Sequence, residues 1–403
     1  MCHRMIKNFH DRLQHDHQSH DSQISNTRSF KSCVYFTNWA VYEKKHFPCD
    51  IPYEYYSHIF YAFIAVDPLT GKLKFTDEWC DLQMPLKSLV PGETVLGNIQ
   101  QLNQMKKLNR QLKVCMSIGG WGTHTQFEAV VQDPEKQHSF VKSVVEFVEK
   151  YHFDGVDIDW EYPKNLSQGK ALANLLKVLR HALPPQRLLT IAAPGGHEHI
   201  KQLPIKVMDQ YLSFWNLMAY DFSGSGWSEK VGYHSNLFGN NGDNDMCADS
   251  IVKAYTKHGV SPQKLVLGMP MYARIFSGVQ EGHVGSKFAK TDKEDTLGYN
   301  KIKDILGNAK DQNILEHGFD VKKVAAFAYN LKTKQFITYD NVQSAKIKGS
   351  YVKSHELGGG MWWDSSGDRP ISNNCKDNES LVYHFVDQLG GCKALEDSQN
   401  SLH

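Results

Sequence analysis

The chain has 403 residues, and its 45 Lys and Arg residues nearly balance 44 Asp and Glu residues. That length suffices for one large domain or for two to three average ones. The balanced charge gives no polyelectrolyte attraction to nucleic acid or to an anionic membrane, so we expect neither as a partner. No run of about 18 apolar residues occurs, so no membrane-spanning helix is expected.

Both ends of the chain are polar. Residues 1–30 contain five His and lack the apolar core of a signal peptide, so we expect a disordered arm. A weak metal site in this arm is the alternative to a solvated tail. By default we expect a cytoplasmic protein, with unconventional secretion as the alternative. The eight cysteines form no C-x-x-C pair, which favours reduced thiols over a disulfide framework or a zinc site. Residues 393–403 are a polar tail.

From residue 31 onward, strand patterns alternate with helix patterns. Amphipathic helices are predicted near residues 100–110, 140–148, 172–179, 251–259, 344–355 and 380–389. The predicted strands cover residues 33–39, 58–66, 114–118, 153–163, 188–193, 214–221, 265–274 and 358–364. Eight strands interleaved with helices belong to the α/β class and favour a closed (β/α)8 TIM barrel over an open sheet.

One interval breaks this alternation. Residues 275–340 separate the seventh strand from its helix, and they contain two apolar runs, 324–329 and 336–339, joined by a polar turn. This pattern predicts a small α+β insertion domain with antiparallel strands, placed between strands seven and eight. The barrel itself would then comprise residues 31–274 and 341–392.

The fourth strand carries three carboxylates, Asp157, Asp159 and Glu161, which alternate with apolar residues at positions 156, 158 and 160. Because strand side chains alternate between faces, the carboxylates share one face at spacings of about 6–7 Å. Crowded carboxylates raise one another's pKa, and a raised pKa allows a carboxylic acid to serve as a general acid near neutral pH. A metal site or a structural acidic face are the alternatives. Glu161 lies at the carboxyl end of the strand, where TIM barrels place catalytic residues.

These residues also carry a family resemblance. Residues 154–161 fit the pattern D-G-x-D-x-D-x-E, which resembles the signature of glycoside hydrolase family 18, the chitinases. Five further segments resemble family motifs in order and spacing: YFTNW (35–39), SIGGW (117–121), MAYD (218–221), MYAR (271–274) and GMWW (360–363). The resemblance spans about residues 31–392. It is closest to fungal chitinases that have an α+β insertion but no signal peptide or chitin-binding module.

The resemblance implies a retaining, substrate-assisted mechanism. Glu161 would protonate the glycosidic oxygen, and the substrate's own 2-acetamido oxygen would act as the nucleophile. Glu161 would then activate the incoming water as a base. Asp159 would orient the acetamido N–H, Asp157 would share a proton with Asp159, and Tyr220 would hydrogen-bond the acetamido oxygen. We therefore expect no metal and no organic cofactor.

The resemblance further implies a sugar-binding set. Asp221 and Arg274 would bind sugar hydroxyls, and Trp363 would form the apolar floor beneath the ring. The full expected set is Tyr35, Phe63, Gly120, Trp121, Met218, Asp221, Tyr272, Arg274 and Trp363. Two other residues in the motifs have structural interpretations: Asp154 as an acceptor for loop N–H groups and Trp160 as a core residue. Because neighbouring strand residues face opposite sides, one of Trp362 and Trp363 should face the helix layer, and the resemblance favours Trp363 on the inside.

The substrate implied by the resemblance is chitin or a chito-oligosaccharide, with endo action favoured and a monomer as the default state. Two alternatives stay open. An endo-β-N-acetylglucosaminidase acting on N-glycans would share the acidic strand, although the insertion and Trp363 argue against it. A non-catalytic chitin-binding lectin would share the scaffold, but such proteins have usually lost an acidic residue that this chain retains.

Overall fold

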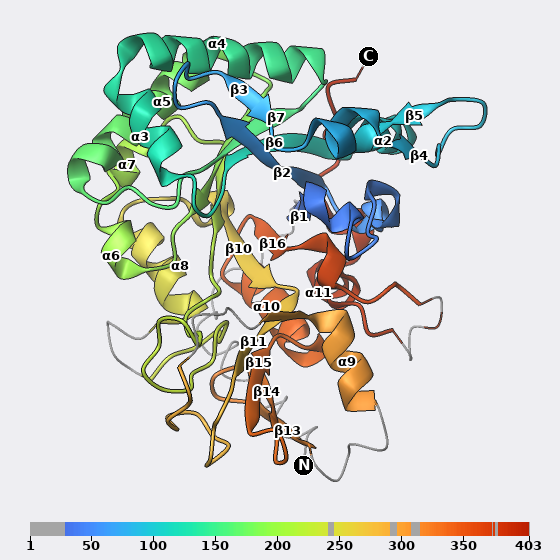
Figure 1. Ribbon diagram of the computed structural model, residues 1–403, viewed down its shortest axis with the longest axis vertical. Coiled ribbons are helices and arrows are strands. Elements are labelled where there is room, and N and C mark those ends of the chain that lie inside the picture. Colours follow the sequence, from blue (N-terminus) through green and yellow to red (C-terminus); the bar gives the residue numbers. More distant parts are fainter. Residues whose placement is uncertain are drawn as a thin grey trace, which may run out of the picture.

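The computed structural model describes residues 29–240, 246–290, 296–307, 315–372, 374 and 378–402. Eight parallel strands form a closed barrel, because β1 pairs in parallel with both β16 and β2 (Figure 1). The barrel strands are β1 (Lys31–Thr37), β2 (His58–Val66), β6 (Lys113–Gly119), β7 (Gly155–Asp159), β8 (Leu188–Ala193), β9 (Phe214–Leu217), β10 (Leu265–Pro270) and β16 (Gly359–Trp363). The predicted TIM barrel is confirmed. The predicted disordered arm, residues 1–30, lies almost entirely outside the described residues.

Helices cover the outside of the barrel (Figure 1). They are α2 (Gly97–Leu108), α3 (His124–Gln132), α4 (Pro134–Lys150), α5 (Leu166–Ala182), α6 (His197–Ile200), α7 (Ile205–Met208), α8 (Ala248–Lys257), α10 (Val342–Ser354) and α11 (Leu381–Leu389). Local sequence sets where they begin: α4 starts at Pro134, and the preceding Asp133 carboxylate accepts the N–H groups of Glu135 and Lys136. Short strands β3 (Leu73–Phe75), β4 (Pro85–Leu86) and β5 (Val95–Leu96) lie in the loops before α2.

The barrel interior is filled rather than open. One buried apolar cluster draws a residue from each of six strands, which can only meet in the lumen: Cys33, Phe60, Cys115, Phe214, Val266 and Met361. A larger cluster joins the outer faces of the strands to the helices. Trp362 belongs to this outer layer, with its ring 5.8 Å from that of Phe385 on α11. Trp160 stacks on Phe127 of α3 at 5.5 Å, so its predicted core position is confirmed.

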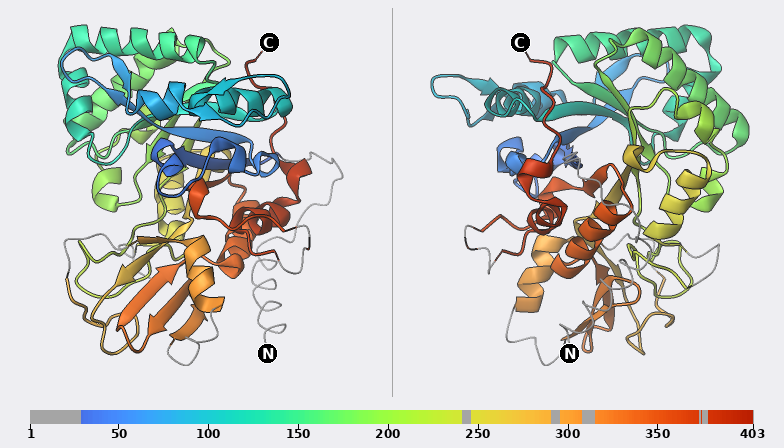
Figure 2. Two further views of the ribbon diagram at one scale, coloured as in Figure 1. Left: turned by 45° about the vertical axis from the view of Figure 1, so that its right-hand side comes forward. Right: turned by 180° about the vertical axis from the view of Figure 1, so that it is seen from behind.

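The insertion forms a second, antiparallel sheet with strand order β12-β11-β15-β14-β13 (Figure 2). Its elements are β11 (Tyr272–Phe276), β12 (Thr296–Gly298), α9 (Tyr299–Gly307), β13 (Leu315–Asp320), β14 (Ala325–Asn330) and β15 (Gln335–Tyr339). The predicted seventh strand, 265–274, is too long: β10 ends at Pro270, and Tyr272 already pairs with the insertion strand β12. The continuous apolar run conceals this change of sheet, which occurs where proline supplies no N–H for the ladder.

Three further features bear on the sequence predictions. The six cysteines within the described residues are all free thiols, namely Cys33, Cys49, Cys80, Cys115, Cys247 and Cys392. Among the described helices, none has the length and apolar character needed to cross a bilayer. The polar C-terminal segment is attached to the barrel, because Leu395 pairs in parallel with Phe30 just before β1.

Candidate active site

Asp157 is the buried centre of the site, with no exposed surface. It accepts hydrogen bonds from the hydroxyls of Tyr35 (2.7 Å), Ser117 (2.8 Å) and Thr190 (2.7 Å), and from the Asn216 amide at 3.4 Å. These donors come from β1, β6, β8 and β9, so only the closed barrel can assemble them. Burial raises the pKa of Asp157, and the four hydrogen bonds partly oppose that rise.

Asp159 lies two residues after Asp157 on β7, on the same face of the strand, and it is 3 % exposed. Its Oδ1 atom is buried and has no hydrogen-bond partner within the described residues. Burial, together with the negative charges of Glu161 and Asp157, raises the pKa of Asp159 well above its ordinary value. The raised pKa favours the protonated form of this side chain.

Glu161 follows the end of β7. Burial raises its pKa to about 7, Asp221 adds to the rise, and a hydrogen bond with Tyr162 opposes it. A carboxyl group with this pKa can both give and take a proton at neutral pH. Within the described residues, no three His, Cys, Asp or Glu side chains are grouped as a metal site would require.

Two glycines allow β6 to approach this strand. Gly119 and Gly120 have φ of +116° and +90°, and the Gly120 N–H donates to the Asp159 carbonyl oxygen at 2.9 Å. A Cβ on Gly119 would lie 2.2 Å from the Asp159 carbonyl oxygen, and one on Gly120 would lie 2.5 Å from the Phe63 ring. Residues with side chains would displace both neighbours, so the glycines are needed for the shape of the site.

Asp221 forms a second acidic centre with a different environment. Tyr272 donates its hydroxyl to Oδ1 at 2.6 Å, the Arg274 Nε donates at 2.8 Å, and His234 Nδ1 lies 3.5 Å away. Burial alone would raise the pKa of Asp221, but the contacts with His234 and Arg274 hold it below its usual range. Asp221 therefore stays charged. Since Tyr272 and Arg274 are on β11, the insertion sheet contributes directly to the site.

Aromatic rings form the wall of the site. The Trp363 ring lies 5.3 Å from that of Tyr35 and stacks on that of Phe63 at 5.7 Å. Trp39, which is 47 % exposed, extends this row from Phe63 at 6.0 Å. Trp121 is 76 % exposed. Exposed rings of this kind can stack on the apolar faces of sugars.

Tyr220 joins the two acidic centres. Its ring lies 6.3 Å from that of Tyr272, and burial, followed by the charges of Asp221 and Asp159, raises the pKa of its hydroxyl well above the ordinary value. The hydroxyl thus stays protonated and can donate a hydrogen bond. Met218 is half-buried just after β9. Non-proline cis peptide bonds precede Phe63 within β2, Tyr162 shortly after β7 and Asp364 at the end of β16.

Comparison with known proteins identifies the family. The model of glycosyl hydrolases family 18 matches residues 31–368, which is most of the chain. The chain belongs to glycosyl hydrolases family 18. It is 35 % identical to the sporulation-specific chitinase 2 of Saccharomyces cerevisiae, over 92 % of this chain and 80 % of that protein. It is 34 % identical to endochitinase 1 of Metarhizium robertsii, over 92 % and 88 %. The structure of chitinase ChiA74 from Bacillus thuringiensis superposes with a TM-score of 0.80 at 26 % identity, covering 90 % of this chain and 70 % of that one.

In this family 18 barrel, sequence reasoning missed several residues that the structure places in the site. Thr190 and Asn216 gave no signal, because each is a single polar residue in an apolar strand. Trp227, whose ring lies 4.6 Å from the Arg274 guanidinium, follows a Gly- and Ser-rich segment that could have marked it as an exposed loop residue. His234 lies 13 residues after Asp221 in an irregular loop, so no periodicity relates them.

The first acidic residue of the family 18 signature lies away from the site. Asp154 precedes β7 at the amino-terminal end of the barrel, where its Oδ2 atom lies 2.7 Å from Lys106 Nζ. The same atom accepts the Val114 N–H at 2.7 Å, and Oδ1 accepts the Ser401 N–H at 2.7 Å. The predicted structural role of Asp154 as an acceptor of N–H groups is confirmed.

Proposed function

We propose that this family 18 glycoside hydrolase is a chitinase that cleaves β-1,4 linkages between N-acetylglucosamine units, with endo action favoured. The names of the relatives from yeast and Metarhizium support the substrate. The observation that carries the mechanism is the pair at the end of β7. Glu161 has a pKa of about 7, beside a buried Asp159 whose Oδ1 atom lacks a partner.

In this mechanism, Glu161 donates its proton to the glycosidic oxygen as the bond breaks. The substrate's acetamido oxygen attacks the anomeric carbon and forms an oxazolinium intermediate with a positive charge. Asp159 accepts the acetamido N–H and stabilises that charge, while Asp157 shares a proton with it. The carboxylate of Glu161 then takes a proton from water, which opens the intermediate with net retention.

The remaining residues position the sugar. The protonated Tyr220 hydroxyl donates to the acetamido oxygen and aligns it for attack. The charged pair of Asp221 and Arg274 binds sugar hydroxyls, and Trp363 supports the apolar face of the ring. Tyr35, Phe63, Gly120, Trp121, Met218 and Tyr272 complete the proposed binding surface. Because the substrate supplies the nucleophile, the residues need no metal or organic cofactor.

The pH dependence follows from Glu161. The general acid must be protonated, so activity should be present below a pKa of about 7 and fall as the pH rises through it. The expected fall is roughly tenfold per pH unit above the pKa. Profiles of kcat/KM between about pH 5 and 9 would measure it, and a flat or rising alkaline limb would contradict the role of Glu161.

The direct test is hydrolysis of chitotetraose by the wild type and by Glu161→Gln, with the product anomers followed by NMR. The amide is nearly isosteric, so binding should survive while kcat falls by about 10²–10⁴-fold or more. Glu135→Gln, on the exposed start of α4, is the matched control and should keep full activity. Initial release of β-anomers supports retention, whereas α-anomers would contradict the substrate-assisted mechanism.

The same assay distinguishes the two alternatives. If the wild type binds chitotetraose but yields no product, the protein is a lectin on this scaffold. If it cleaves a high-mannose glycoprotein and leaves chito-oligomers intact, it is an endo-β-N-acetylglucosaminidase. Equal activity of the wild type and Glu161→Gln would show that the acidic strand has been misinterpreted.

A further inference from the structure

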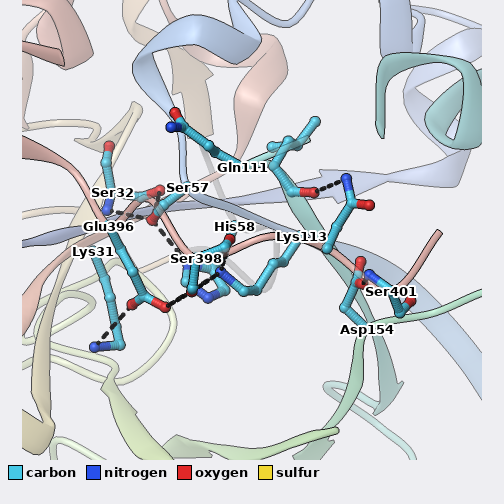
Figure 3. Close-up of polar contacts among 12 residues, drawn as sticks. Lys31, Ser32, Ser57, His58, Gln111, Lys113, Asp154, Glu396, Ser398 and Ser401 are labelled. Carbon is cyan, nitrogen blue, oxygen red and sulfur yellow. Dashed lines mark hydrogen bonds and ion pairs between the residues drawn. The ribbon is translucent and has the colours of Figure 1, made fainter. Parts of the chain in front are cut away.

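The last described residues, 395–402, form a segment across the amino-terminal mouth of the barrel, opposite the active site. We call this segment the C-terminal strap (Figure 3). At its start, the Phe30 N–H donates to the Ala394 carbonyl and the Glu396 N–H donates to the Phe30 carbonyl, both at 2.8 Å. The strap therefore begins as a short parallel extension beside β1.

The far end of the strap is fixed at α2 and β7. Asn400 is 6 % exposed, and its side-chain amide donates to the carbonyl oxygens of Lys106 (2.9 Å) and Leu112 (3.0 Å). The next residue, Ser401, donates its N–H to Asp154 at 2.7 Å. Eight residues, six of them polar, form no helix or strand of their own and are thus held by specific bonds at both ends.

Between these ends the strap covers a partly buried group of charges (Figure 3). The Glu396 carboxylate pairs with Lys31 Nζ at 3.3 Å and with Lys113 Nζ at 3.2 Å. Lys113 also donates to the Ser398 carbonyl oxygen (2.9 Å) and hydroxyl (2.7 Å). Because Lys31 begins β1 and Lys113 begins β6, a single carboxylate joins two strands of the barrel rim.

His58, the first residue of β2, lies beneath this cover and has no exposed surface. Its Nδ1 atom shares a hydrogen bond with the Ser57 hydroxyl at 2.8 Å, and its Nε2 atom is buried without a partner in the described structure. The ring of Phe214 packs edge-on at 5.4 Å. A proton on Nε2 would have no acceptor while the strap is in place.

We propose that the C-terminal strap is an acid-released latch on the amino-terminal mouth of the barrel, opened by protonation of His58 and Glu396. The charged groups around His58 are Lys31 on β1, Lys113 on β6 and Glu396 on the strap. The two cations oppose a charged imidazole, and within the described residues the anion beside it is Glu396 of the strap. Release of the strap admits water to His58. The imidazole therefore binds a proton more readily in the open form than in the closed form.

Both groups act in the same direction. Burial lowers the pKa of His58 to about 3, well below its ordinary value of about 6.5. The closed latch therefore loses stability as the pH falls from about 6.5 toward 3. Burial alone would raise the pKa of Glu396, but His58, Lys31 and Lys113 hold it below the usual range. Its contribution is present above about pH 4.3 and is lost as the pH falls further.

Solvent already reaches one side of the latch. Glu396 lines an open cavity of about 420 Å³ between α2, the 3-10 turn Tyr53–Tyr55 and the start of the strap. The other lining residues are Tyr53, Glu54, Tyr56, Leu108, Asn109, Gln111, Cys392 and Leu395. Protons can thus reach the Glu396 carboxylate without unfolding of the barrel, which allows the strap to open on its own.

Hydrogen–deuterium exchange of the full chain between about pH 4.5 and 7 tests the latch. The probes are the amides of Glu396, Asn400 and Ser401, corrected for intrinsic exchange, with the Ile158 amide on β7 as reference. We expect the strap amides to lose about fifteen-fold protection between pH 6.5 and 5, because an open-form pKa of about 6.5 leaves His58 half protonated at the start of this range and opening is then favoured by up to about tenfold per pH unit. The Ile158 amide should stay protected over this range.

Two variants identify the groups. His58→Asn should make strap protection nearly independent of pH between about 6.5 and 5, whereas His138→Asn, on the exposed face of α4, should behave as the wild type. Glu396→Gln should lower strap protection already at pH 7, because it removes both ion pairs. Strap protection that does not change with pH, or that is lost only together with Ile158, would overturn the latch. A His58→Asn variant whose strap protection is as acid-sensitive as that of the wild type would also overturn the latch. If His58→Asn does not fold, the Glu396→Gln variant still tests the proposal.

Discussion

The two ends of β7 hold buried carboxylates of the same motif in opposite environments. At the amino-terminal end, Asp154 is 3 % exposed and pairs with the fully buried Lys106 at 2.7 Å. From the middle of the strand to its carboxyl end, Asp157 and Asp159 are equally buried, but their neighbours are neutral donors and other acids. Asp154 therefore has a structural role beside a lysine, whereas burial raises the pKa of Asp157 and Asp159, whose neighbours in the described structure are neutral donors and acids.

Asp221 shows that position in the barrel does not decide the outcome. It lies at the catalytic end, yet Arg274 and His234 beside it keep its pKa below the usual range. Glu161 has no such cation among its neighbours in the described structure, and burial raises its pKa to about 7. The charge of the nearest partners thus separates a proposed proton donor from a proposed sugar-binding carboxylate within one site.

The largest expected effect is on stability at the amino-terminal end. Lys106→Met leaves Asp154 buried without its cation and should cost about 3–5 kcal/mol in the free energy of unfolding. Urea denaturation would measure this loss. The neighbouring Lys107, exposed and paired with Glu93, is the matched control, and Lys107→Met should cost less than about 1 kcal/mol. Similar values for the two variants would contradict the structural role of the buried pair.

The next effect is on catalysis at the carboxyl end. Asp159→Asn keeps the shape of the side chain but cannot share a proton with Asp157, so kcat should fall by about 100-fold or more. Asp154→Asn is the control at the other end of the strand. It should lower stability while leaving kcat of the folded enzyme near that of the wild type. Equal losses of kcat in Asp159→Asn and Asp154→Asn would contradict the proposed difference between the two ends of β7.

The contrast between the two ends was only partly accessible from the sequence. Strands β2 and β8 were predicted with the bounds that the structure has, because apolar runs end there at polar or turn residues. Alternation within 153–163 placed the three carboxylates on one face. Their pKa values depend on partners that alternation cannot supply: the hydrogen-bond donors to Asp157 are 122, 40, 33 and 59 residues away in the chain.

Other features depend on contacts distant in sequence and gave no local pattern. The segment 395–402 is too short and polar to indicate that it would be bound at the barrel mouth. Tyr272 and Arg274 were expected on a barrel strand, and only the structure shows that they belong to the insertion sheet. Strand alternation predicted only that Trp362 and Trp363 face opposite sides, and the family resemblance predicted that Trp363 faces inward.

A smaller effect is expected at the apolar floor. Trp363→Ala should raise KM for chitotetraose about tenfold, equivalent to ~1.4 kcal/mol, because the sugar loses its aromatic support. Steady-state kinetics would measure the change. Trp362→Phe, which alters the outer face of the same strand, should leave KM unchanged. A wild-type KM in Trp363→Ala would remove this residue from the proposed binding surface.

The most direct test of the central claim is the titration of the Glu161 side-chain carboxyl by ¹³C NMR, with Glu161→Gln used to assign its signal. The claim is that burial without a cationic partner prepares this carboxyl for proton transfer. We expect a midpoint at a pH of about 7. A midpoint near the ordinary value for glutamate, about 4.3, would contradict it.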